Sequence, residues 1–177
     1  MTLLAILSGA LLPLASAWAL GAVLVRRKDE PEIQFAAGAA GLSFAVFVLC
    51  LCGLAYWWAF LGLGLVAAVG WWRVRPTLSF EPLPRAALIL APYLVFYFVN
   101  ALAPETVADG ITYHLGLPAE YLRTGGFPDR VTFYGMIPQG MELLYTMAFA
   151  FGKHSAAKLI EFAFFVGTVP LLSLIHI

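Results

Sequence analysis

Charged residues are what this sequence has least of. Only 11% of its 177 residues are Asp, Glu, Lys or Arg, against about a quarter in a soluble globular domain. Hydrophobic residues make up 62%, and the mean hydropathy is +0.90. This composition predicts a protein whose main solvent is lipid. The ten basic residues balance the ten acidic ones, so no excess of positive charge favours a nucleic acid as partner.

Cysteine is scarce in this sequence, and the amino end has no positive residues. Cys50 and Cys52 are the only cysteines and lie in one apolar run, which excludes a disulfide framework and a cysteine-based metal site; we assign no metal ligands. A signal peptide would begin with positive residues, whereas here the positive residues 26–28 follow the first apolar stretch. That order predicts a retained span with the amino terminus outside.

Long apolar segments account for most of the chain. A membrane-crossing helix needs about 20 mostly apolar residues, and five segments qualify: 3–25, 34–53, 55–72, 86–103 and 155–172. We therefore predict an all-α fold, a polytopic transmembrane helical bundle of about five spans with a helical outer loop. Residues 35–72 have little room for two helices and a turn, and a re-entrant pair is the alternative there.

The basic residues predict the orientation. They concentrate at 26–28 and 73–85, in two loops that fall on the same side, which is predicted to be cytoplasmic in the inner (plasma) membrane. We divide the chain into three amino-terminal spans (1–85) and a second part (86–177) with an outer loop at 104–154. The last apolar run ends without polar residues, so we expect a fragment with a truncated final span and a non-native tail at 172–177.

The outer loop has its own helix signals. Asp109 precedes apolar residues at helical spacing, which predicts a helix along the membrane surface. Pro118 either kinks that helix or starts a second one, which would end at the glycines 125–126. A further short helix is expected from 138 to 151, with a link at 152–154 to the last span.

Asp109 is the candidate with the most chemistry. A carboxylate at the membrane surface can take a proton from an attacking hydroxyl, or bind a divalent cation through oxygen. The alternative is an N-cap, which is a frequent use of Asp before a helix and is favoured by the residues alone. His114 could orient a substrate or bind a metal but is more often structural, while Tyr113 and Gln139 are candidate sugar contacts.

Several stretches of the second half together resemble a known family. They are 109–115 (DGITYHL), 117–122 (LPAEYL), 138–145 (PQGMELLY), 151–152 (FG) and 156–159 (AAKL). In this order they look like the first outer loop of bacterial polytopic glycosyltransferases of the GT-C class, related to protein mannosyltransferases and aminoarabinose transferases. The resemblance covers about residues 86 to 172. Three spans precede the one that leads into the loop here, whereas in that class the loop usually follows the first span directly.

The resemblance implies a sugar transferase that uses a polyprenyl-phosphate-linked donor and a glycan, lipid or protein acceptor on the non-cytoplasmic face. Asp109 matches the acidic residue of the family's active centre, where we prefer a general base to a metal ligand. A divalent cation is the open alternative, and no other cofactor is assigned. Lys158 matches a basic position and is the candidate phosphate partner; the alternative is a lysine at the interface paired with Glu161.

A non-enzymatic membrane protein is the rival interpretation. A transporter would place ionisable residues near the middle of the bilayer, and the first four predicted spans contain essentially none. An assembly subunit in which Asp109 only caps a helix stays open.

Overall fold

The structure is a computed structural model that describes residues 2–25, 31–74 and 85–175, with side-chain surroundings for all of these except 85–87 and 169–175. The predicted basic loop residues 26–28 and 75, and the end of the predicted tail at 176–177, lie outside the described residues. Helix accounts for 83% of the described residues, and no strand occurs among them, which confirms the all-α prediction.

Six α-helices and three shorter helical turns follow one another along the described residues. The α-helices are α1 (Leu3–Leu24), α2 (Pro31–Leu51), α3 (Trp57–Val74), α4 (Ala91–Leu102), α5 (Gly116–Thr124) and α6 (Gly140–Ile175). The shorter turns are a 3-10 helix η1 (Arg85–Leu90), a π-helix η2 (Gly110–His114) and a 3-10 helix η3 (Tyr134–Met136).

The first three helices are long and apolar enough to cross a membrane, which makes the chain a membrane protein. They match the first three predicted spans to within three residues at each end. With 21 and 18 residues, α2 and α3 are about 31 and 27 Å long at 1.5 Å per residue. These are the lengths of two complete spans, not of the two short arms of a re-entrant pair.

The other two predicted spans have a different form. The fourth is divided between the 3-10 helix η1 and α4, which has only 12 residues. The fifth is the second half of α6, a helix of 36 residues that is interrupted at Lys153. Lys153 has φ 53° and ψ −146°, so the chain changes direction there, inside the predicted link at 152–154. The predicted helix before that link begins at Gly140 instead of 138.

Small residues bring the membrane helices together. A Cβ atom on Gly21 would lie 1.8 Å from the carbonyl oxygen of Gln34, and one on Gly38 would lie 1.7 Å from that of Ala17. The backbones of α1 and α2 therefore touch directly, as they do in membrane helix pairs with small residues at the contact. Bulkier side chains at these two positions would hold the helices apart.

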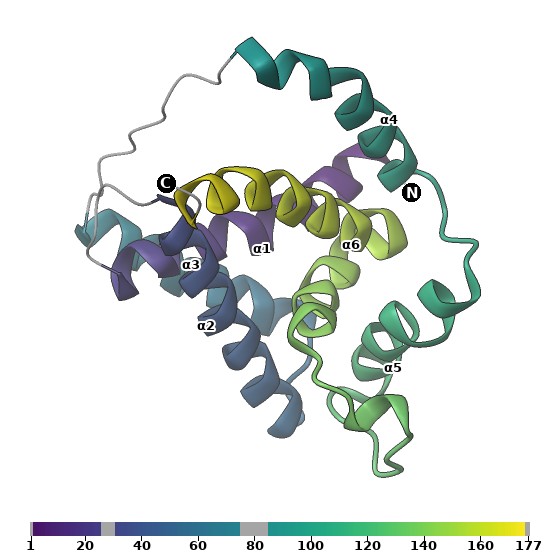
Figure 1. Ribbon diagram of the computed structural model, residues 1–177. Helices are drawn as coiled ribbons and strands as arrows, with labels where there is room; N and C mark the ends of the chain where they lie inside the picture. Colours follow the sequence, from purple (N-terminus) through teal and green to yellow (C-terminus); the bar gives the residue numbers. More distant parts are fainter. Residues whose placement is uncertain (1, 26–30, 75–84, 176–177) are drawn as a thin grey trace.

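Helix α6 crosses the pair formed by α1 and α2 at the centre of the molecule (Figure 1). Its kink fits against the first turns of α1, where a Cβ on Gly9 would lie 2.8 Å from the amide nitrogen of Gly152. Helix α4 packs on the second half of α6 through aromatic rings such as Tyr97 and Phe165, whose centroids are 5.3 Å apart.

The first part of the segment 103–152 lies at one end of the bundle, beside the turn between α2 and α3, and its last part, residues 140–152 of α6, packs on α2. The amide of Ala55 donates to the carbonyl of Gly125 at 2.8 Å, and the amide of Phe127 donates to the carbonyl of Cys50 at 3.2 Å. Gly125 has the left-handed conformation, φ 76°, that ends α5 where the sequence predicted. We call 103–152 the outer segment, and it carries most of the polar side chains discussed below.

Candidate functional site

Asp109 begins the helical part of the outer segment but does not cap it. Its backbone is already helical, with φ −65° and ψ −43°, and its side chain makes no capping hydrogen bond. The carboxylate is exposed and forms no hydrogen bond or ion pair with any residue that the structure describes. The N-cap alternative is therefore wrong, because an N-cap residue has extended backbone and a side-chain oxygen bonded to an amide.

A π-helical turn follows Asp109 directly. The amide of Leu115 donates to the carbonyl of Gly110 at 2.9 Å, a bond between residues five apart in the sequence. In a π-helix the backbone hydrogen bond that closes one turn joins residues five apart, whereas in an α-helix it joins residues four apart. Asp109 and His114 are also five residues apart, at the start and the end of this turn. Such single π-turns within helical segments are frequent at functional sites.

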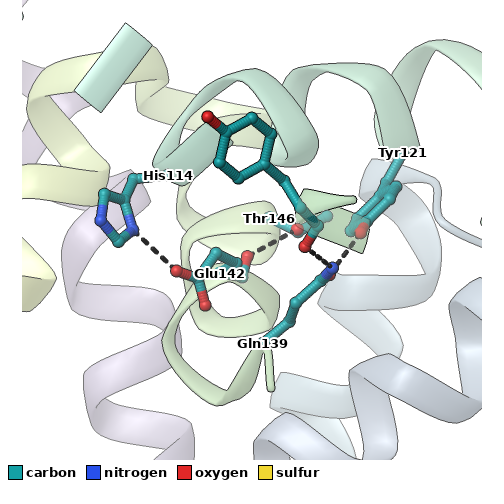
Figure 2. Close-up of polar contacts among 6 residues, drawn as sticks. His114, Tyr121, Gln139, Glu142 and Thr146 are labelled. Carbon is teal, nitrogen blue, oxygen red and sulfur yellow. Dashed lines mark hydrogen bonds and ion pairs between the residues drawn. The ribbon is translucent and has the colours of Figure 1, made fainter. Parts of the chain in front are cut away.

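His114 is bonded to a carboxylate from the first turn of α6. Its Nδ1 lies 2.7 Å from Oε1 of Glu142 (Figure 2). The Glu142 side chain is only 10% exposed, whereas that of His114 is 44% exposed. The Glu142 backbone carbonyl in turn accepts the hydroxyl of Thr146 at 2.8 Å. The pairing of Glu142 with His114, 28 residues earlier, was not predicted from the sequence.

Gln139 holds two tyrosines in place. Its side-chain oxygen accepts the hydroxyl of the buried Tyr121, and its amide group donates to the backbone carbonyl of Tyr134 at 3.2 Å (Figure 2). Burial raises the pKa of Tyr121 to about 12, so its hydroxyl keeps its proton and acts as the donor. Gln139 has both ends of its amide occupied, which makes it a support of the site more than a free sugar contact.

Tyr113 stacks between two other rings. Its centroid lies 4.7 Å from that of Tyr134, with only 2° between the ring planes, and 4.0 Å from the imidazole of His114. The predicted candidates Tyr113 and His114 are therefore neighbours in one cluster. Tyr134, which the sequence analysis did not select, completes the stack.

Lys158 is engaged at the junction between α4 and α6. Its ammonium donates to the carbonyl of Ala103 at 3.3 Å and lies 3.6 Å from Oε2 of Glu105. The expected pairing with Glu161 is therefore wrong, since the lysine pairs with a residue 53 positions earlier. Both side chains are largely covered, with exposed fractions of 14% for Lys158 and 16% for Glu105.

Glu105 contacts both Lys158 and the first residue of the π-turn, Gly110. Its Oε1 accepts the amides of Thr106 and Val107, both at 2.8 Å, and these bonds together with Lys158 lower the pKa of its carboxyl group. Its side chain packs against Gly110, where a Cβ atom would lie 2.7 Å from Cγ of Glu105. Glu105, four residues before Asp109, thus bonds the backbone amides just ahead of the helical turns, and the sequence analysis missed this role.

The structure thus brings the predicted residues together in two groups. Tyr113, His114 and Gln139 belong to one cluster with Glu142, while Lys158 belongs to the Glu105 junction. Asp109 lies in the chain between the two, five residues before His114. No three His, Cys, Asp or Glu side chains are close enough to hold a metal ion within the described ranges. A divalent cation at Asp109 stays a prediction.

Comparisons with known proteins add no relative to this description. No family model matches the sequence, and no curated protein and no solved structure matches it.

Proposed function

We propose that this chain belongs to a membrane glycosyltransferase of the GT-C type, to which it contributes membrane spans and an outer loop. In this proposal a sugar is transferred from a polyprenyl-phosphate-linked donor to a glycan, lipid or protein acceptor on the non-cytoplasmic side. The proposal starts from the resemblance of residues 86–172 and from the membrane nature of the chain.

The exposure of the Asp109 carboxylate, and its lack of a partner among the described residues, support the proposal most directly. A cap would have satisfied its carboxylate inside the protein, whereas the exposed side chain has no partner in the described structure. An ionised carboxylate that is free to meet a ligand, on a short π-turn, is what proton transfer from a substrate hydroxyl requires.

The reaction needs one proton acceptor and one leaving group. The acceptor oxygen attacks the anomeric carbon and loses its proton to Asp109, while the bond between that carbon and the phosphate oxygen breaks. The phosphate leaves on its lipid with the bonding electron pair. Lys158 is the candidate partner for this charge, and a phosphate would have to compete with Glu105 for it.

The proposal also includes the finer topology. Five spans place the amino terminus, the turn between α2 and α3 and the outer segment on the non-cytoplasmic side of the plasma membrane. Two observations support this arrangement. Gly9 near the start of α1 lies against Gly152, and the end of α2 is hydrogen bonded to the outer segment, so all three regions lie at one end of the bundle.

Transfer by the protein in native membranes tests the function. The measurement is the incorporation of labelled sugar from a panel of polyprenyl-phosphate sugars, compared between wild type and Asp109→Asn. We expect a loss of about 10²- to 10⁴-fold for this substitution, which is the usual contribution of a positioned proton acceptor.

Asp129→Asn is the matched control. Asp129 is another exposed carboxylate of the outer segment without a partner among the described residues, and its substitution should leave transfer unchanged. If Asp109→Asn retains wild-type transfer, Asp109 is not at the active centre. If wild type transfers no sugar from any donor, the chain is a non-enzymatic membrane subunit.

A further inference from the structure

The buried carboxylate of Glu142 determines which ring nitrogen of His114 carries hydrogen. A carboxylate with an exposed fraction of only 10% needs a hydrogen-bond donor, because burial without one is costly. His114 Nδ1 at 2.7 Å is in the position of that donor. With Oε1 of Glu142 as the acceptor of this bond, the shared hydrogen belongs to Nδ1.

The other ring nitrogen is left for a ligand. In a neutral imidazole with hydrogen on Nδ1, Nε2 carries a lone pair and accepts hydrogen bonds. The His114 side chain is 44% exposed, and the structure gives it no hydrogen bond besides the one to Glu142 within the described ranges. A carboxylate that orients a histidine in this way is common where the opposite nitrogen has a function.

The surroundings of His114 suit a sugar. The stacked rings of Tyr113 and Tyr134 adjoin the imidazole, and Tyr134 is 38% exposed. Binding sites for small molecules combine such aromatic surfaces with a few fixed polar groups. The bond from Gln139 to the carbonyl of Tyr134 holds this loop in place.

We propose that His114, oriented by Glu142, is a substrate-binding residue whose Nε2 accepts a hydrogen bond from a sugar hydroxyl beside the Tyr113–Tyr134 stack. This inference rests on the proposed function and adds a contact to it, because Asp109 remains the proton acceptor. In this inference one sugar meets both groups, which lie five residues apart across the π-turn.

Two amide substitutions separate this role from a structural one. The amide of Asn lies near the position of Nδ1 and that of Gln near the position of Nε2. His114→Asn therefore keeps a donor for Glu142 but has nothing at Nε2, whereas His114→Gln keeps an acceptor there. We expect kcat/KM for transfer to fall by about 10- to 100-fold in His114→Ala and His114→Asn, as for one lost hydrogen bond to a substrate, and by less than tenfold in His114→Gln.

The tautomer of His114 provides a readout that does not depend on activity. Nitrogen NMR of histidine-labelled protein should show hydrogen on Nδ1 in wild type and a loss of that preference in Glu142→Ala. A wild-type signal with hydrogen on Nε2 would overturn the inference, whatever the activity.

The transfer assay has three further outcomes. Wild-type transfer by His114→Asn would show that the histidine only satisfies Glu142, and would overturn the inference. Transfer within twofold of wild type in all three variants, with Asp109→Asn inactive, would overturn it as well but leave the proposed function standing. Absence of transfer by wild type from every donor would overturn both.

Discussion

The membrane helices and the outer segment are held together by different forces. Helices α1 and α2 meet through glycines whose backbones touch, and Gln34 of α2 adds a hydrogen bond to the carbonyl of Val25 at the end of α1. The outer segment has few buried apolar side chains before α5 and keeps its shape through Glu105, His114, Gln139 and their partners. The comparison suggests that the membrane part is a scaffold, and that the chemistry belongs to the segment at its end.

The largest expected effect concerns the scaffold. Gly38→Val should destabilise the protein by at least about 3 kcal/mol, because the new side chain would collide with the backbone of α1 at Ala17 and Gly21, and a backbone cannot move aside as a side chain can. The measurement is the thermal unfolding midpoint in mild detergent.

Gly62→Ala is the matched control for that prediction. Gly62 is exposed on α3, and a Cβ there would meet no described atom within 4 Å. Its substitution should leave stability unchanged or raise it slightly, since alanine favours helix over glycine. An equal loss in both variants would contradict the view that close backbone contact holds α1 and α2 together.

A smaller effect is expected from the polar support of the outer segment. Tyr121→Phe removes the hydroxyl that Gln139 accepts and leaves that amide oxygen without its partner, at a cost of about 1 to 2 kcal/mol. Tyr93→Phe on α4 is the control, because Tyr93 is 52% exposed and its hydroxyl has no hydrogen bond to a described residue. Proteolysis within 103–152 would report the loosening, and equal cleavage of the two variants would count against it.

The smallest effect belongs to the junction between α4 and α6, and it depends on pH. Glu105→Gln keeps the size of the side chain but removes its charge, so about 1 kcal/mol should be lost with the ion pair to Lys158. The pKa of Glu105 is lower in the folded protein than its usual value of 4.5. Its contribution is therefore complete above that value and is lost as the pH falls through the lowered pKa.

Unfolding midpoints of wild type and Glu105→Gln, measured over a range of pH, check the direction of this pH dependence. The difference should be constant around neutral pH and disappear in acid. A difference that grows as the pH falls would mean that the ionised carboxylate does not stabilise the junction.

The elements of the fold followed largely from the sequence. Apolar runs of about 20 residues located α1, α2 and α3, because the width of the bilayer fixes how much apolar chain a span needs. Gly125 predicted the end of α5, since glycine adopts the left-handed conformation without strain. The 3-10 helix η1 before α4 and the kink at Lys153 depend on how these helices pack on their neighbours, and periodicity contains no such information.

The partners of the polar side chains are what the tertiary structure alone decided. From the sequence, Glu161 was a possible partner for Lys158, and a nearby backbone amide was a possible partner for Asp109. Both expectations were wrong. Lys158 instead meets Glu105, and His114 meets Glu142. Residues far apart in the chain become partners only when the helices between them are placed, whereas apolarity and turn preferences act over a few residues and can be read directly.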